Sequence, residues 1–302
     1  MAVDGELKSR LPYPFNEDLS PVLLRLNRRT ERGRQQLAND PVTAAYLAAA
    51  LRLVERRLGP RSEPTGTPHP AAAERSFFGF LTQRAVAAEV EGNPDPFPRR
   101  GSVSTLRTSW RSQSDFVADL LGFVLWTGYY PASYMGLWDG GAEQLAEGDD
   151  FARALQEVAY DATFHLLAMV TFRIQLAASI GAQDDPAIRT VLAAKYERGQ
   201  TIWGGIYTRM MTSRGLQLRE GISLGELADI LTALVEGCAL RAMAEGPQTR
   251  VMDAANRRGL LSTAALALVA GSMEPKGNED GLSLADYVNA MAAAGRGRAG
   301  PG

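Results

Sequence analysis

The sequence is poor in the residues that build disulfides and metal centres. It contains one cysteine, Cys238, and two histidines, His69 and His165, among 302 residues. A single cysteine excludes an intramolecular disulfide and a cysteine-cluster metal site, and two histidines argue against a histidine-rich metalloenzyme. A P-loop and a GxGxxG motif are also absent. We therefore expect no metal, no cofactor and no enzymatic activity.

Long apolar runs are missing as well. The N-terminal residues carry charges and prolines where a signal peptide needs an apolar stretch. The longest uncharged stretch, residues 120–138, approaches the length of a membrane span, but Pro131, three glycines and three tyrosines interrupt it. We interpret it as a buried, aromatic-rich segment, and expect a cytoplasmic protein without membrane contact.

A large net charge is absent from the whole chain but not from its parts. The formal net charge is −2, yet residues 1–114 carry 17 basic and 12 acidic side chains, whereas residues 115–302 carry 15 and 22. Arginines cluster within residues 25–34 and 99–111. This asymmetry is typical of a polyanion-binding module joined to an acidic domain. A genome-wide preference for arginine would produce similar clusters on ordinary solvated surfaces.

Apolar residues recur at helical spacing almost throughout, and alternation of strand type is hard to find. The pattern predicts an all-α fold with helices over 19–39, 41–58, 74–92, 102–110, 151–181, 186–215, 224–246 and 258–273. Ser112 with Asp115, and Ser223 with Glu226, form capping boxes that open two helices. Two Pro/Gly-rich inserts, residues 59–75 and 93–101, separate the N-terminal helices.

Two further patterns allow a catalytic or a structural interpretation. Residues 221–225 match the GxSxG nucleophile pattern, but Ser223 is more simply the N-cap of the following helix. Asp161 and His165 lie four residues apart on one predicted helix, as a metal or acid–base pair would. A buried, hydrogen-bonded histidine explains the same spacing, and we favour that explanation.

Residues 46–59, 80–92 and 102–121 together resemble the helix–turn–helix domain of TetR-family transcriptional regulators. Leu81-Thr82, Val86-Ala87 and Gly92 match the second helix of that domain, and residues 102–106 (SVSTL) match the start of its recognition helix. The resemblance implies contacts to double-stranded DNA in the major groove and along the phosphates. The implied DNA-binding residues are Thr82, Arg84, Arg99, Arg100, Ser102, Ser104, Thr105, Arg107, Thr108 and Arg111.

The chain departs from the family pattern within this domain. Arg107 stands where the family has a tyrosine, Ser109 where it has a histidine, and Gln113 where it has a phosphate-facing lysine. Both inserts are longer than the corresponding family loops. These departures leave open an alternative, in which the protein binds a ligand or a partner protein and has lost or changed its DNA-reading surface.

Residues 150–273 resemble the regulatory domain of the same family, whose last two helices form a four-helix bundle in the dimer. Small alanines on apolar helices permit such close approach, although packing within one chain would use them equally well. The resemblance implies a homodimer. The implied interface residues are Leu231, Leu234, Val235, Cys238, Ala242, Leu261, Ala264, Ala265 and Leu268.

Aromatic and methionine side chains are frequent on the central helices of this half. Such residues often form a plain core, but the polar tips of tyrosine and tryptophan need partners. In the family, the same helices enclose an effector pocket, which implies a small apolar or aromatic ligand. The candidate ligand-binding residues are Phe123, Trp126, Tyr130, Tyr134, Phe164, His165, Met169, Phe172, Trp203 and Tyr207.

These observations predict four parts. They are a basic helical extension (1–40), a helix–turn–helix domain with two insertions (41–127), a ligand-binding and dimerisation domain (128–275), and a short helix with a tail (276–302). The predicted function is that of a homodimeric repressor, which a small effector releases from its DNA operator.

Overall fold

The helix formed by residues 41–58 is the centre of the N-terminal part of the chain. In the computed structural model, which describes residues 2–58, 78–126, 132–245, 251–278 and 281–290, this helix is α3 (Pro41–Leu58). Asp40 accepts the N–H of Val42 at 2.8 Å, and Pro41 takes the first helical position, where its missing N–H is not needed. The described residues are mostly helical, which confirms the all-α prediction.

Two compact units divide the chain. Unit 1 comprises residues 1–131 and 169–196, and unit 2 comprises residues 132–168 and 197–302. The chain therefore passes from unit 1 to unit 2 and back to unit 1. It passes to unit 2 a second time within a single helix, α10 (Pro186–Arg214). Residues 169–196 thus belong with the N-terminal residues, so the division differs from a single cut near residue 127.

Unit 1 is a cluster of helices around α3. It contains α1 (Ala2–Arg10), α2 (Glu31–Ala38), α4 (Gln83–Glu89), the 3-10 turn η2 (Val90–Gly92), α5 (Val103–Ser109), α6 (Gln113–Val124) and α9 (Val170–Gly181). Helix α3 contacts α1, α2, α4 and α9, while α5 packs on α4 and α6 on α9. The largest fully buried side chains in its core include Tyr46, Leu81, Trp110, Phe116 and Phe123.

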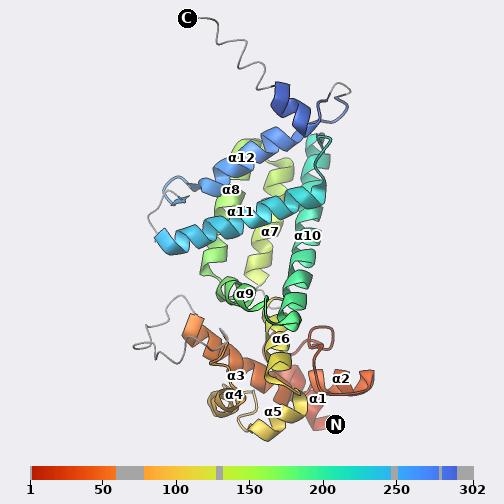
Figure 1. Cartoon of the computed structure of the whole chain (residues 1–302), viewed down its shortest axis with the longest axis vertical. Helices are drawn as coiled ribbons and strands as arrows, with labels where there is room; N and C mark the ends of the chain where they lie inside the picture. The colour runs from red at the N-terminus through yellow and green to blue at the C-terminus, as the bar shows by residue number, and fades with distance from the viewer. Residues whose placement is uncertain (1, 59–77, 127–131, 246–250, 279–280, 291–302) are drawn as a thin grey trace, which may run out of the picture. The chain divides into compact units, whose positions relative to one another are not determined.

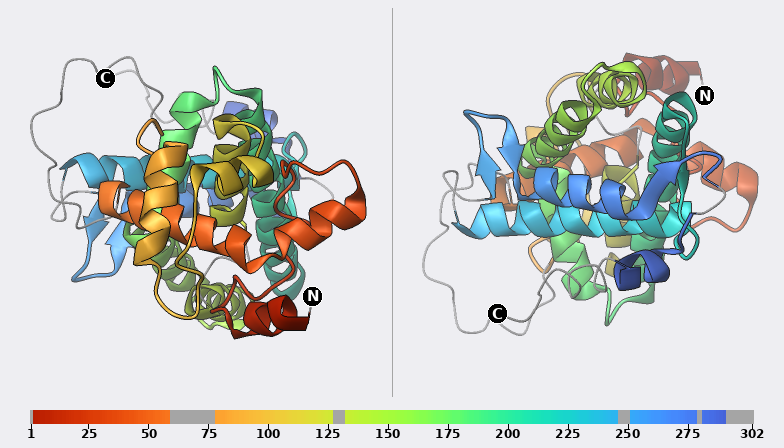
Figure 2. Two further views of the ribbon diagram at one scale, coloured as in Figure 1. Left: turned by 90° about the horizontal axis from the view of Figure 1, so that it is seen from below. Right: turned by 90° about the horizontal axis from the view of Figure 1, so that it is seen from above.

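Unit 2 is built on α8 (Phe151–Ala168), which packs against α7 (Ala132–Glu147), α11 (Leu224–Glu245) and α12 (Leu260–Ser272). Helices α11 and α12 lie side by side (Figure 1, Figure 2). Two short antiparallel ribbons complete the unit, β1 (Leu216–Leu218) with β4 (Met273–Pro275), and β2 (Met252–Asp253) with β3 (Arg258–Gly259). A small apolar core forms between the helices of this unit.

Several helix boundaries agree with the sequence prediction. Helices α3, α5, α10, α11 and α12 lie within a few residues of their predicted ranges. Both capping boxes are present. Ser112 Oγ accepts the N–H of Asp115 at 3.0 Å, and Ser223 Oγ accepts the N–H of Glu226 at 3.1 Å. Ser223 is therefore an N-cap, as expected.

Other predicted helices are wrong in part. Only Glu31–Ala38 of the range 19–39 is helical, because residues 19–26 are held in turns and a β-bridge by unit 1. The range 151–181 is broken at Met169 into two helices, α8 and α9. Within 74–92, residues 74–77 lie outside the described part, and the helix begins at Gln83. Helix α1 lies within the predicted basic helical extension (1–40), although no helix over 2–10 was predicted, and α7 was not predicted at all.

No single helix among the described residues is both long and apolar enough to span a membrane. Only the bent pair α8 and α9, taken together, reaches that length and composition.

Candidate DNA-binding surface and ligand pocket

A buried tyrosine holds the start of α5 in unit 1. Tyr46 of α3 is fully buried, and its hydroxyl accepts the N–H of Ser102 and donates to the Ser102 carbonyl, both at 2.9 Å. Ser102 in turn caps α5 by accepting the N–H of Thr105 at 3.0 Å. The short polar helix is thus fixed from behind, and its first residues face outward.

The insert over residues 93–101 is packed into unit 1 by Asn93. This buried amide donates to the carbonyls of Ala45 at 3.1 Å and Pro98 at 2.9 Å, and its oxygen accepts from Arg52 at 2.6 Å. Arg52 also pairs with Glu89 at 3.0 Å. A hydrogen bond from Arg56, together with Arg52, holds the pKa of Glu89 below its usual value. The segment joining α4 to α5 therefore has a defined path.

All ten candidate DNA-binding side chains are exposed on unit 1. Thr82 caps α4 by accepting the N–H of Ala85 at 3.1 Å. Arg107 donates to the side chain of Gln83 at 2.9 Å, and Arg99 pairs with Asp95 at 3.2 Å. The complete exposed set is Thr82, Arg84, Arg99, Arg100, Ser102, Ser104, Thr105, Arg107, Thr108 and Arg111.

An N-terminal segment brings further arginines to the end of α5. Leu26 forms a β-bridge with Trp110, and the N–H of Asn27 donates to the Ser109 carbonyl at 2.8 Å. Arg28 donates to the Thr108 carbonyl at 3.0 Å. The exposed Arg25 and Arg28 therefore lie at the same corner of unit 1 as α5, although about 80 residues separate them in sequence. The sequence shows the arginine cluster but not this pairing.

A buried carboxylate fixes the same segment. Asp119 of α6 is 2% exposed and accepts the N–H groups of Leu24 at 2.9 Å and Arg25 at 3.0 Å. Its other oxygen accepts the indole N–H of Trp110 at 2.8 Å. Burial raises the pKa of Asp119 to about 7, against the opposing effect of these three hydrogen bonds. One carboxyl group thus joins the N-terminal segment, the end of α5 and α6.

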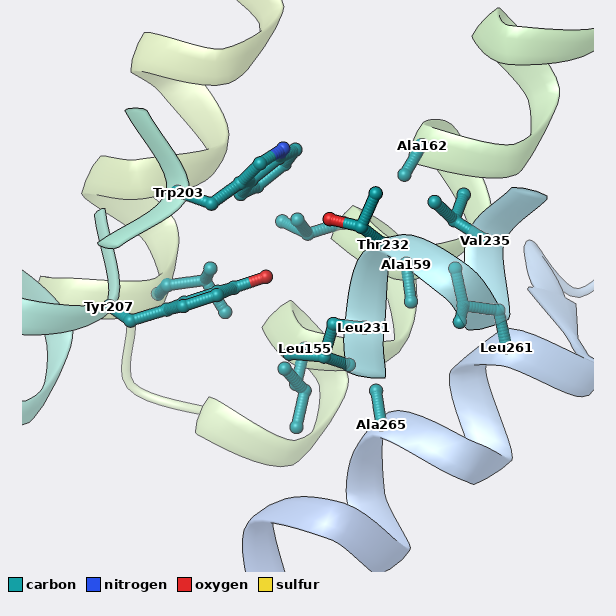
Figure 3. Close-up of a pocket in the computed structure, with 12 residues that line it drawn as sticks. Leu155, Ala159, Ala162, Trp203, Tyr207, Leu231, Thr232, Val235, Leu261 and Ala265 are labelled. Carbon is teal, nitrogen blue, oxygen red and sulfur yellow. The ribbon is translucent and has the colours of Figure 1, made fainter. Parts of the chain in front are cut away.

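Unit 2 contains an apolar pocket between α7, α8, α10, α11 and α12 (Figure 3). The pocket encloses about 510 Å³ of space, part of it open to solvent. Trp203 and Tyr207, one turn apart on α10, stack with their ring centres 5.8 Å apart, and Trp138 packs edge-on against Trp203 at 4.5 Å. The lining residues are Leu145, Leu155, Val158, Ala159, Ala162, Trp203, Tyr207, Leu231, Thr232, Val235, Leu261 and Ala265.

Few polar groups reach this pocket, and none of its lining residues carries a charge. The hydroxyl groups of Tyr207 and Thr232 point toward each other from α10 and α11 (Figure 3). Neither hydroxyl has a hydrogen-bond partner within the described residues. Burial raises the pKa of Tyr207 above its usual value, so the phenol stays neutral and keeps its proton.

Of the ten candidate ligand-binding residues, only Trp203 and Tyr207 line the pocket. Phe123 and Phe172 are fully buried, and Phe123 packs against Phe15 in the core of unit 1. Phe164 is half-exposed and packs edge-on with His165. The others do not line it either: Trp126 and Met169 are partly buried elsewhere, Tyr130 lies outside the described residues, and so does the side chain of Tyr134.

The sequence prediction missed the aliphatic walls of the pocket. Ala159 and Ala162 of α8 lie opposite the aromatic residues, and their small size leaves the space open. Four lining residues, Leu231, Val235, Leu261 and Ala265, were predicted for the dimer interface instead. The useful signal was the spacing of Trp203 and Tyr207, which places both rings on one face of α10.

The candidate dimer residues mostly face the core of their own unit. Cys238, Ala242, Leu261 and Ala265 are buried there, and Leu234, Ala264 and Leu268 are partly buried. The outer faces of the two helices are also apolar at a regular spacing. On α11 the exposed residues of this apolar row are Ile230, Ala233, Gly237 and Leu240, with the exposed charged residues Glu226, Asp229, Arg241 and Glu245 beside it or near the helix ends, and on α12 the exposed residues are Leu260, Thr263, Ala267 and Ala270. A partner would meet these outer faces.

Asp161 pairs with Arg257 rather than acting with His165. Its two carboxylate oxygens accept from Arg257 at 2.6 and 2.7 Å. Within the described ranges, no group of three or more His, Cys, Asp or Glu side chains is arranged to hold a metal ion.

Comparison with protein-family models, with curated proteins and with solved structures finds no match to this chain. The basic surface of unit 1 and the pocket of unit 2 are therefore the basis for assigning a function.

Proposed function

We propose that the protein is a homodimeric, TetR-like regulator of transcription, whose affinity for DNA changes when a small molecule binds in unit 2. The observation that carries this proposal is the exposure of ten polar and basic side chains on and around α4 and α5. Tyr46 and Asn93 hold these elements from behind through buried hydrogen bonds. A rigid support with an exposed polar surface is what sequence-specific recognition requires.

Short polar side chains and arginines have different roles in this proposal. Ser104 and Thr105 project from α5 and are small enough to approach base edges in the major groove. Arg107, Arg111 and Arg84 would neutralise phosphates on either side. Arg25 and Arg29 of the N-terminal segment would extend the basic surface, since Asp119 and Trp110 hold that segment at the end of α5.

The outer faces of α11 and α12 support a dimer. Ile230, Ala233, Gly237 and Leu240 follow the spacing i, i+3, i+7, i+10, which gives an apolar seam along one side of a helix. Leu260 begins a seam of the same spacing on α12. Two copies facing each other through these seams would form a four-helix bundle, in which small residues allow close approach.

A dimer of this kind would present two copies of α5 to successive major-groove faces, about 34 Å apart. A ligand in the pocket acts by a population shift if it binds more tightly to a state with a different spacing. A hundredfold difference in affinity between the two states corresponds to about 2.7 kcal/mol.

The test is DNA binding by the purified full chain. Fluorescence anisotropy would measure affinity for fragments upstream of its own coding region, at several salt concentrations. Replacing both Arg107 and Arg111 by alanine should weaken binding at least tenfold and reduce the salt slope by about 2, since each phosphate contact contributes ~0.9. Arg153→Ala, at an exposed site on α8 in unit 2, is the matched control and should bind normally. Absence of salt-sensitive binding to every fragment would refute the proposal.

A second function follows if the DNA-reading surface has changed its partner. The hydrogen bond between Arg107 and Gln83 favours this alternative, because it engages the guanidinium within unit 1. The protein would then bind its ligand in unit 2 and a partner protein through unit 1. In that case the wild-type protein binds DNA only weakly and nonspecifically, and replacing Arg107 and Arg111 by alanine leaves that affinity unchanged.

A further inference from the structure

The pocket of unit 2 carries information about the chemistry of its ligand. None of its twelve lining residues is charged, and most of its wall is aliphatic. An ion moved from water into such a site loses several kcal/mol of hydration that no counter-charge restores. A carboxylate, a phosphate or an ammonium group is therefore a poor occupant.

The shape of the pocket favours a flat body. The stacked rings of Trp203 and Tyr207 form one wall, with an angle of 23° between their planes. The alanines on the opposite side, Ala159 and Ala162, stand across from these rings (Figure 3). Aromatic ligands gain from offset or edge contacts with such rings, beyond the area that they bury.

Two hydroxyl groups mark the position of a polar end. The Tyr207 and Thr232 hydroxyls point toward the same space and have no hydrogen-bond partner within the described residues (Figure 3). Each can donate and accept a hydrogen bond. A ligand hydroxyl between them can accept from one and donate to the other, whereas a purely apolar ligand leaves both without a partner.

We infer that this pocket binds an uncharged, flat aromatic molecule that carries one hydroxyl group, with the hydroxyl placed between Tyr207 and Thr232. The inference rests on the proposed function only where it expects ligand binding to change the affinity for DNA. Binding of the ligand to the pocket does not depend on DNA. The inferred ligand class is narrower than that of all small apolar effectors, because charged ligands and pure hydrocarbons should both bind more weakly than an aromatic alcohol.

Isothermal titration calorimetry with three probes of nearly equal size tests the inference on the full chain. We expect 2-naphthol to bind, and 2-naphthoate to bind at least thirtyfold more weakly. Naphthalene should bind about tenfold more weakly than 2-naphthol, because two hydrogen bonds of ~1 kcal/mol or less each are missing. Equal affinity for 2-naphthol and 2-naphthoate would overturn the inference, and so would no binding of 2-naphthol.

Near-isosteric variants locate the ligand's hydroxyl. Thr232→Val and Tyr207→Phe should each weaken 2-naphthol about threefold and leave naphthalene unchanged. Thr201→Val is the matched control, since Thr201 is exposed on the same helix as Tyr207 and bonds to the Glu197 carbonyl. Unchanged 2-naphthol affinity in both pocket variants would overturn the placement. Thermal unfolding of each variant confirms that it is folded.

The result separates this inference from the proposed function. Binding of 2-naphthol with no DNA binding refutes the regulator and supports the pocket assignment. DNA binding by a protein that ignores 2-naphthol supports the regulator and overturns the ligand class.

Discussion

Replacing Asp119 by alanine tests the buried junction between the N-terminal segment and α6. The carboxylate accepts three hydrogen bonds, from the indole N–H of Trp110 and from the backbone N–H groups of Leu24 and Arg25. Alanine would leave all three donors without their acceptor. Trp110 is fully buried, so water cannot replace the lost partner there.

The expected loss is large compared with the stability of a typical domain. An unsatisfied buried donor costs ~1–3 kcal/mol, and the Trp110 N–H lies at the upper end because it is fully enclosed. The two backbone donors are partly buried and add ~1 kcal/mol each. The sum, about 5 kcal/mol, is a substantial share of a total stability of ~5–15 kcal/mol.

Urea unfolding monitored by tryptophan fluorescence would measure this loss. Asp229→Ala, at an exposed site on α11, is the control and should change the free energy of unfolding by ~0.5 kcal/mol or less. Combined with Trp110→Phe, Asp119→Ala should show a coupling energy of at least ~1 kcal/mol. A loss below ~1 kcal/mol, or strictly additive effects, would refute the hydrogen-bond reasoning.

Four shorter predictions concern pH, anchoring, assembly and a buried ion pair. Burial raises the pKa of Asp119 from 3.8 to about 7, so the folded state binds this proton more tightly than the unfolded state, and the contribution of the protonated Asp119 to stability should fall as pH rises from about 4 to 7. The free energies of unfolding of wild type and Asp119→Asn, measured in urea, should therefore depend differently on pH in that window. Parallel pH curves would contradict this prediction. Tyr46→Phe should lower stability by ~1–2 kcal/mol and weaken DNA binding, because the start of α5 loses its anchor; unchanged melting and affinity would count against the anchor. Leu240→Glu should shift the mass seen in sedimentation from dimer to monomer, and an unchanged mass would exclude the α11 seam. Glu274→Ala should cost ~3 kcal/mol in urea unfolding, because Arg219, whose side chain is only 13% exposed, loses its partner at 2.8 Å, and a neutral result would make that pair dispensable.

The sequence was a good guide wherever a signal was local. Helix α3 begins after Asp40 at Pro41, and α11 begins after the capping box of Ser223 and Glu226. These signals act within one turn of helix, so a single chain segment contains all the information.

The sequence failed where distant contacts decide the conformation. Leu19, Leu23 and Leu26 have helical spacing, but Asp119 and the bridge to Trp110 hold this segment in another form. Helix α7 contains Gly136, Gly140 and Gly141, which lower helix propensity and hid it. At Gly141, a Cβ would lie 3.2 Å from Val158, so the glycine serves close packing on α8.

The candidate sites show the same contrast. The candidate DNA-binding residues came from a motif within residues 82–111, and all ten are exposed. The pocket draws its lining from five helices, and aromatic residues are equally typical of a core. Phe123 and Phe172 belong to such a core, and the position of an aromatic residue in the sequence does not distinguish the two environments.

The hydrogen bonds between Asp119 and the N-terminal segment also affect the order in which the chain folds during synthesis. Leu24 is made 95 residues before its carboxylate partner. At a synthesis rate of ~5–20 residues per second, the segment waits roughly 5–20 s for that partner. During this interval Leu19, Leu23 and Leu26, all buried in the finished protein, lack the part of their core that α5 and α6 supply. The segment over residues 19–26 is therefore among the last parts of unit 1 to reach its final place, although it is made before α5 and α6.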